Sequence, residues 1–225
     1  ALTPESAVRA SAGVSYRAPS FLESSAYETI RIDDKVRWVG TRQTTPVEPE
    51  RVRHFELGYM AQLRELGLSL DVRAFHERYL RYLDSRSCII GEPACPPPEA
   101  YAPFPHAPDR PPKQFRFVNS AALTRHGAEI SVDWRRPGWG RVVASQAFID
   151  IDADAGASDG DFELSAPSTI TSLLLVKDLP QRWRASLGYY RHGEMYWLNQ
   201  GDRVPVTNRF DLRLARSFGA PSADN

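Results

Sequence analysis

Apolar and polar residues alternate one by one along most of the chain, and this alternation restricts the possible folds more than any other feature. Residues 209–214 read RFDLRL, so aromatic or aliphatic side chains take every second place and charged ones lie between them. The same pattern recurs at 8–17, 53–64, 68–75, 127–135 and 182–189. A period of two is typical of strands whose two faces meet different surroundings. The sequence therefore predicts an all-β chain.

Eight strands are predicted, at about 7–17, 52–64, 67–82, 114–136, 140–151, 163–178, 182–196 and 206–217. The fifth and sixth are less regular, because residues 173–176 read LLLV without alternation. Helix is limited to single turns near residues 4–6 and 21–27. The 18 prolines are consistent with an all-β chain that has irregular loops.

The connections between these strands alternate in length. Short links at 64–67, 136–139 and 179–181 lie between long ones at about 18–51, 83–113, 152–163 and 197–205. In an antiparallel up-and-down meander this places every long loop at one end. Transmembrane barrels have such a pattern, with short periplasmic turns and long extracellular loops. We therefore expect residues 1–225 to be a single segment of a transmembrane β-barrel.

Composition agrees with this expectation and excludes other classes. No run of about 18 apolar residues exists, which excludes transmembrane helices but not barrel strands. The formal net charge is zero, so nothing indicates a nucleic-acid partner. Trp134, Trp139, Trp183 and Phe218 lie beside the short turns, where an interfacial aromatic girdle is expected. The alternative, a soluble sheet, needs a second layer over the apolar face, and no segment supplies one.

Cys88 and Cys95 are the two cysteines of the chain. Their spacing fits a small disulfide-closed loop, which would stabilise the fold by about 2 kcal/mol in an oxidising compartment. Two free thiols remain the alternative. A metal site is disfavoured because no histidine or further cysteine lies close by.

The sequence contains no signature of catalysis or of a bound cofactor. A Gly-x-Ser-x-Gly elbow, a phosphate-binding loop and a His-Glu-x-x-His motif are all missing. The histidines, at 54, 76, 106, 126 and 192, lie on separate segments without ligand spacing. The aspartates at 152, 154, 159 and 161 lack the order of an EF-hand and indicate a solvated acidic loop. We expect no enzyme, no cofactor and no metal site.

Several stretches resemble the TonB-dependent outer-membrane receptors. They are VRASAGVSYRAPSFLE (Val8–Glu23), PVEPERVRHFELGYMAQL (Pro46–Leu63), LSLDVRAFHERYLRYL (Leu68–Leu83), FVNSAALTRHGAEISVDW (Phe117–Trp134), SAPSTITSLLL and the terminal VPVTNRFDLRLARSF. No single stretch is specific, but they follow the family's order over nearly the whole chain.

The resemblance implies a Gram-negative outer-membrane protein with a 22-stranded barrel, of which this chain would be about a third. No plug domain is present in residues 1–225, and the chain does not finish on a strand with a terminal aromatic, so further strands are expected downstream. The implied partners are outer-membrane lipid, a plug domain of the same polypeptide and, through it, TonB. Charged residues on the inner faces are expected to form ladders that either hold the plug or hydrate the lumen.

The resemblance implies energised uptake of a metal chelate, with ferric siderophores as the commonest cargo. Haem is the alternative suggested by Tyr16-Arg17-Ala18-Pro19, although no histidine lies between that element and Pro46. Cobalamin, carbohydrate or a passive porin-like barrel also remain open. Arginine and aromatic side chains in the long loops suit an anionic, ring-bearing ligand. The candidate ligand-contacting residues are Arg31, Arg37, Trp38, Tyr101, Phe104, His106 and Trp197.

Overall fold

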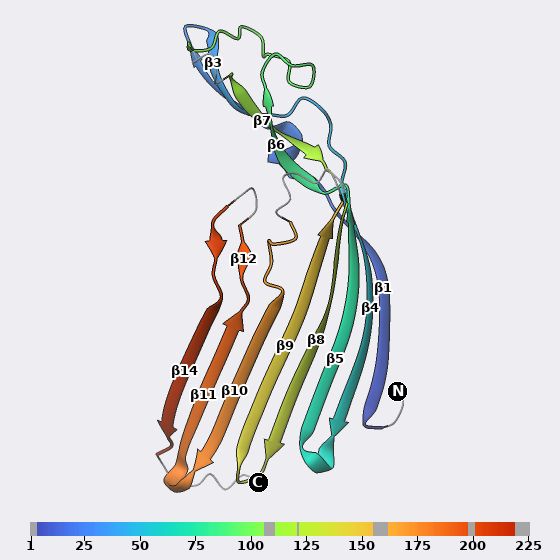
Figure 1. The fold of residues 1–225 in the computed structure, drawn as a ribbon, viewed down its shortest axis with the longest axis vertical. Helices are drawn as coiled ribbons and strands as arrows, with labels where there is room; N and C mark the ends of the chain where they lie inside the picture. The colour runs from blue at the N-terminus through green and yellow to red at the C-terminus, as the bar shows by residue number, and fades with distance from the viewer. Residues whose placement is uncertain (1–3, 106–110, 121, 155–161, 198–200, 219–225) are drawn as a thin grey trace.

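The computed structural model describes residues 4–105, 111–120, 122–154, 162–197 and 201–218. Its main element is an eight-stranded antiparallel sheet with the order β1-β4-β5-β8-β9-β10-β11-β14 (Figure 1). The strands are β1 (Ser6–Arg17), β4 (Glu50–Leu63), β5 (Leu68–Leu80), β8 (Leu123–Arg136), β9 (Gly140–Ala153), β10 (Thr169–Leu179), β11 (Trp183–His192) and β14 (Thr207–Arg216). Each pairs with the barrel strand before it, which confirms the predicted meander. None of the helices in the described ranges is long and apolar enough to cross a membrane.

Three tight turns join the strands at one end of the sheet, which we call the short-turn end. They are η1 (Arg64–Leu66), the turn at 137–139 and η3 (Pro180–Arg182). Gly67 follows η1 with φ of 63°, and a Cβ there would lie 2.0 Å from the backbone oxygen of Arg135. Only glycine fits this position without strain. The opposite end, where the long connections lie, is the long-loop end.

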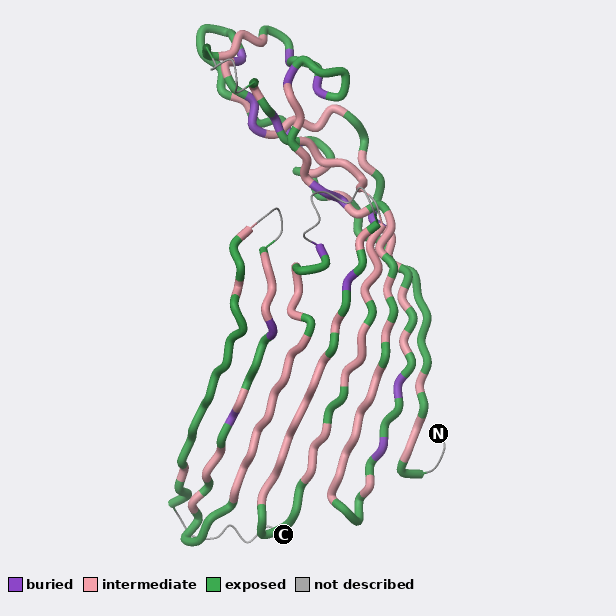
Figure 2. The backbone as a smooth tube through the Cα atoms, viewed as in Figure 1, coloured by how far each residue is buried: buried purple, intermediate pink, exposed green. Residues whose placement is uncertain are grey.

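Cross-strand pairing sorts the side chains of the sheet onto two faces, because directly opposed residues point to the same side. The apolar face carries residues such as Leu57, Tyr59, Leu70, Val72, Ile130, Val132, Leu187, Phe210 and Leu212. The polar face carries Arg9, Glu56, Asp71, Arg73, Glu129, Asp133, Arg184, Asp211 and Arg213. Large apolar side chains on the first face are exposed, Leu212 to 82%. In Figure 2 most of the sheet is coloured as intermediate or exposed. The sheet is therefore a single layer with no core of its own.

The two irregular predicted strands, β9 and β10, are apolar on both faces over part of their length. Leu173 and Leu175 lie on the apolar face opposite Ala144 and Val142. Leu174 is paired with Val143 on the polar face. The run LLLV does not alternate because this part of the polar face is itself apolar.

Aromatic residues gather at the short-turn end, as the girdle prediction requires. The Trp134 and Trp139 rings lie 5.1 Å apart, and the Trp134 indole donates to the backbone oxygen of Leu66. Lys177 lies 4.8 Å over the Trp139 ring. Such amphipathic groups suit a membrane–water interface.

The first two long connections are not irregular, and that expectation was wrong. They form a second, four-stranded sheet with the order β2-β3-β7-β6, which we call the loop sheet (Figure 1). Its strands are β2 (Tyr27–Ile32), β3 (Lys35–Arg42), β6 (Leu83–Ile89) and β7 (Lys113–Asn119), preceded by the short helix α1 (Phe21–Ser25). The last long connection contains β12 (Met195–Tyr196) paired with β13 (Arg203–Val204).

Three predicted strand boundaries are also corrected. The strand predicted at 114–136 is two strands in different sheets, β7 and β8. The chain bends after β7 because the Asn119 side chain bonds backbone groups of Glu48 and Arg81. The strand predicted from 163 starts at Thr169, after Pro167, whose nitrogen cannot donate to a ladder. The strand predicted to reach 196 ends at His192 and resumes as β12.

Candidate ligand-binding surface at the long-loop end

The loop sheet has a small hydrophobic core of its own. Val36, Val39 and Ile90 are at most 9% exposed, and Tyr101 packs against them. Residues 100–102 add to β3, since the Val36 amide donates to Ala100 and the Ala102 amide donates to Val36. The second long connection is thereby tied to the first. The two connections fold as one unit.

A disulfide closes part of this unit. Cys88 at the end of β6 is bonded to Cys95, and the Cys95 side chain is completely buried. The Gly91 amide donates to the backbone oxygen of Cys95, so the bridged segment is also held by backbone hydrogen bonds.

Arg17 joins the loop unit to the barrel sheet. Its guanidinium donates to Glu23 at 2.9 and 3.1 Å and to Glu50 at 2.5 Å. Glu50, only 6% exposed, also accepts from the Leu83 amide at 2.7 Å. One side chain at the end of β1 thus connects α1, the start of β4 and the start of β6.

Helix α1 completes the Arg17 connection through its N-terminus. Ser20 and Glu23 form a reciprocal capping box, in which each side chain accepts from the other residue's amide. Hydrogen bonds from Arg17 lower the pKa of Glu23 from 4.5 to about 2. The same bonds to Glu50 and Glu23 raise the pKa of Arg17. The Tyr16-Arg17-Ala18-Pro19-Ser20 element therefore acts as a structural joint, and its two carboxylate partners were not foreseen from the sequence.

Asn119 and Gln43 form a second joint between the loops. Gln43 exchanges two hydrogen bonds with the Phe117 backbone, and Asn119 bonds the backbones of Glu48 and Arg81. An ion pair joins Arg81 and Glu48. These contacts fix β7 above the rim of the barrel sheet.

Four of the predicted ligand-contacting residues lie on the loop unit, and Arg37 and Phe104 are in contact there. Arg37 donates to the Ala102 oxygen at 3.1 Å and lies 6.0 Å over the Phe104 ring. Trp38 and Phe104 are 41% and 48% exposed, whereas Tyr101 belongs partly to the core. The structure thus gives Arg37 and Tyr101 a packing role and leaves Trp38 and Phe104 open to solvent.

The other three predicted contacts are Arg31, Trp197 and His106. Arg31 is exposed on β2 of the loop sheet. Trp197, 62% exposed, directly follows β12, which pairs with β13 in a sheet separate from the loop sheet. His106 lies outside the described residues.

The polar face carries the predicted charge ladder. Arg9 contacts Asp71 at 3.2 Å and Glu56 at 3.4 Å. Arg73 contacts Glu129 at 2.5 Å and Glu56 at 3.8 Å. These pairs cross from β1 to β8 without leaving the face.

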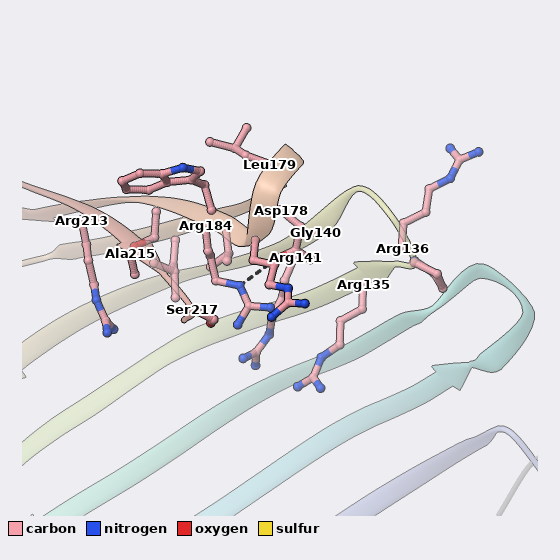
Figure 3. Close-up of a pocket in the computed structure, with 16 residues that line it drawn as sticks. Arg135, Arg136, Gly140, Arg141, Asp178, Leu179, Arg184, Arg213, Ala215 and Ser217 are labelled. Atoms are coloured by element: carbon pink, nitrogen blue, oxygen red, sulfur yellow. Dashed lines mark hydrogen bonds and ion pairs between the residues drawn. The ribbon is translucent and has the colours of Figure 1, made fainter. Parts of the chain in front are cut away.

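Towards the short-turn end the same face becomes strongly basic. A hollow of about 1160 Å³ lies there, and its lining includes one carboxylate, Asp178, and the arginines Arg135, Arg136, Arg141, Arg182, Arg184 and Arg213. Figure 3 shows most of these side chains. Arg184 bonds Asp178 at 2.7 Å, and Asp133 accepts from both Arg135 and Arg141. Arg136 points away from the other labelled arginines. The hollow therefore gives this end of the polar face an excess of positive charge.

One cluster of possible metal ligands was missed because its members lie on different strands. His126 lies 3.3 Å from Asp150 and 4.0 Å from Asp152, and the His76 ring stacks beside it at 6.5 Å. The expected solvated character of this region holds for Asp152 and Asp154, which are exposed. The remaining predicted acidic positions, 159 and 161, lie outside the described residues.

Comparison with known proteins was made by sequence and by structure. The family model described as "TonB dependent receptor-like, beta-barrel" matches residues 1–222. A search of curated proteins finds no match.

Similar solved structures come from several bacteria. The siderophore receptor PirA from Acinetobacter baumannii superposes with a TM-score of 0.66 at 11% identity, over 97% of this chain and 34% of that one. The ferric-catecholate import receptor Fiu from E. coli K12 gives 0.63 at 15% identity, over 95% and 27%. The pyoverdine receptor FpvA from Pseudomonas aeruginosa PAO1 gives 0.61 at 14%, over 94% and 27%.

These identities show a shared fold, and the chain spans between about a quarter and a third of the length of these receptors. The family consists of outer-membrane transporters of Gram-negative bacteria. The match of the family model over nearly all residues agrees with the open meander and its two unlike faces. The chain belongs to the TonB-dependent receptor β-barrel family.

Proposed function

We propose that the chain is part of the barrel of an outer-membrane receptor that takes up a metal chelate, with a ferric siderophore as the cargo. The observation that carries this proposal is the folded loop unit, which presents Arg37 and Phe104 together at the long-loop end, with Trp38 exposed on the same strand as Arg37. Exposed rings beside a guanidinium suit an anionic, ring-bearing chelate, because cation–π contact and charge-assisted hydrogen bonds act at the same place. Three receptors of the same fold are described as siderophore or ferric-chelate receptors, which supports the choice of cargo class.

The apolar face of the sheet would then contact lipid, and the long-loop end would be extracellular. The cargo would first contact the loop unit and the top of the plug domain. The plug, held by the ladder and the basic hollow of the polar face, would rearrange when TonB transmits energy from the inner membrane. Arg17 and Asn119 would hold the loop unit at a fixed height above the lumen.

Uptake of iron-loaded siderophores tests this function. A strain lacking the complete receptor gene is complemented with wild type or with the W38A/F104A variant, and uptake of 55Fe is measured for catecholate, hydroxamate and mixed siderophores under iron limitation. Wild type should restore uptake of at least one class, and W38A/F104A should reduce it about 5- to 30-fold, since each lost ring contact is worth about 0.5–1 kcal/mol.

The matched control is F21A. Phe21 is 84% exposed on α1 in the same connection but lies at the base of the loop unit. Its removal should leave uptake unchanged. Uptake of haem, cobalamin or a carbohydrate in place of every siderophore would reject the cargo and keep the receptor. Ungated diffusion that does not need TonB would reject the receptor itself.

A further inference from the structure

Along β4 and β5 the apolar face stops being apolar before the strands end. On β4 the side chains on this face run Leu63, Ala61, Tyr59, Leu57 and Phe55, and then Arg53 and Arg51. On β5 they run Leu68, Leu70, Val72 and Ala74, and then His76 and Arg78. The nine residues from Leu63 to Phe55 equal the length at which a tilted strand crosses the hydrocarbon, about 9–11 residues. Arg53 and Arg78 follow directly after it.

These two arginines are directly opposite one another. Arg53 on β4 pairs in register with Arg78 on β5, and both side chains are exposed. The flanking residues in the same row, Val14 and Thr124, are uncharged. No ion pair joins either arginine to a carboxylate within the described ranges. Like charges in this arrangement repel and destabilise the sheet unless an anion lies between them.

The neighbouring charges do not supply that anion. Arg51, two residues from Arg53 on the same face, adds a third guanidinium and lies 5.9 Å over the Tyr16 ring. The nearest acidic residues on this face, Asp150 and Asp152, are on β9 and contact His126 of β8. β4 and β5 are both paired on each side, so this part of the face is complete in the structure.

We propose that Arg53 and Arg78, with Arg51, bind a phosphate group of a lipid in the leaflet next to the long loops. The proposal rests on the membrane placement given under the proposed function. A guanidinium presents paired donors that match phosphate oxygens, and two guanidiniums side by side can hold one phosphate from both sides. Phe55, 52% exposed, lies directly below Arg53 on the same strand. An acyl chain of the lipid therefore packs along the apolar side chains of β4 while its phosphate reaches the arginines. A soluble anion has no acyl chain and cannot make the first of these contacts.

The test uses the complete receptor purified in a non-ionic detergent. Binding of bis-phosphorylated lipid A is titrated by native mass spectrometry and compared with its fully dephosphorylated form. Wild type should bind the phosphorylated form preferentially. R53Q/R78Q should weaken that binding by about tenfold or more, because two charge-assisted contacts are lost. R53K/R78K, which keeps both charges, should retain most of the affinity and so separates loss of charge from loss of folding.

The matched control is R64Q/R136Q. Both residues are exposed arginines at the short-turn end of the sheet, Arg64 in η1 between β4 and β5 and Arg136 at the end of β8. Its affinity for lipid A should equal that of wild type. Equal affinity in R53Q/R78Q, or an equal loss in R64Q/R136Q, overturns the proposal.

Competition by millimolar inorganic phosphate that removes the lipid entirely also overturns it, because the site would then bind free anions. Fractionation of cell envelopes separates this proposal from the proposed function. If wild type is absent from the outer membrane, the membrane placement fails. If wild type is inserted there and lipid A binding is insensitive to R53Q/R78Q, only the lipid site fails.

Discussion

Replacing Arg17 with methionine tests whether the loop unit is held to the barrel in the way its contacts indicate. The R17M change removes both ion pairs and leaves the Glu50 carboxylate, whose side chain is 8% exposed, with the Leu83 amide as its remaining described donor. Removing one partner of a buried pair costs about 3–5 kcal/mol. The Arg17 side chain is 48% exposed, so water partly screens the pair, and a loss of about 2 kcal/mol is more realistic.

Hydrogen exchange followed by mass spectrometry on the complete receptor measures this loss. A change of about 2 kcal/mol in the free energy of local opening corresponds to about 30-fold faster exchange. The acceleration should appear in residues 83–89, which form β6, and in the α1 segment, but not in the strands of the barrel sheet. R31A is the control, because Arg31 is an exposed arginine of the same loop sheet without an ion pair to any described residue.

The double variant R17M/E50Q makes the reasoning refutable. If the cost comes from a buried charge without a partner, then neutralising Glu50 as well should recover part of the protection lost in R17M. Exchange that is unchanged in R17M, or that is equally fast in R31A, would refute the assignment. If the double variant exchanges faster than R17M, then side-chain packing, and not the charge of Glu50, accounts for the stability of this connection.

Three other outcomes are expected. The lowered pKa of Glu23 means that its stabilising contribution is complete above pH 4.5 and is lost as the pH falls towards 2, so tryptophan fluorescence of the loop unit should stay constant from pH 7 to 5 and change below 4.5. Serine at both Cys88 and Cys95 should destabilise the bridged segment by about 2 kcal/mol, seen as faster proteolysis within residues 83–105 that a reductant reproduces in wild type. Alanine at Gly138 should lower the free energy of unfolding by about 1–2 kcal/mol through its φ of 70° alone, because a Cβ there meets nothing within 4 Å. Alanine at Gly67 should lower it clearly more, because the Cβ there meets backbone atoms. Urea unfolding of the folded receptor, followed by its heat-dependent shift in gel mobility, compares the two variants.

The strands of the barrel sheet could be predicted because each alternates over a whole crossing. β4 and β5 deviate from the predicted ranges by two residues or fewer at each end. This precision follows from physics, since a one-residue slip would turn every charge of the ladder towards the apolar face. The alternation of short and long connections then predicted the antiparallel up-and-down topology without information on any contact between strands.

The loop sheet could not be predicted in the same way. Its strands are short, and its core consists of a few residues contributed by two connections that are about 50 residues apart. Pairing of this kind is non-local, so no period in the sequence marks it. Residues 114–119 continue in strand-like pattern into 123–136, and only the contacts of Asn119 separate them.

The sequence predicted which residue types could form the candidate ligand site, but only partly which of them lie close together. Arg37 and Phe104 do come together, although 67 positions separate them, whereas Trp197 follows β12, which belongs to a separate sheet. The ligand role of these residues remains the proposal made above. An arginine beside an aromatic ring can bind a ligand, but it can equally join two loops. The hydrogen bond from Arg37 to the backbone oxygen of Ala102 is a contact of the second kind.

The backbone hydrogen bonds between residues 100–102 and β3 have a consequence for exchanging these connections between receptors and for how their sequences can vary. An exchange of either connection alone between two related receptors would leave half of a shared sheet without its counterpart, because Val36 and Tyr101 depend on each other. Chimaeras should therefore tolerate joint replacement of 18–49 and 81–122 better than replacement of one. By the same logic, sequence changes in this shared core should be tolerated best as linked pairs, one in each connection.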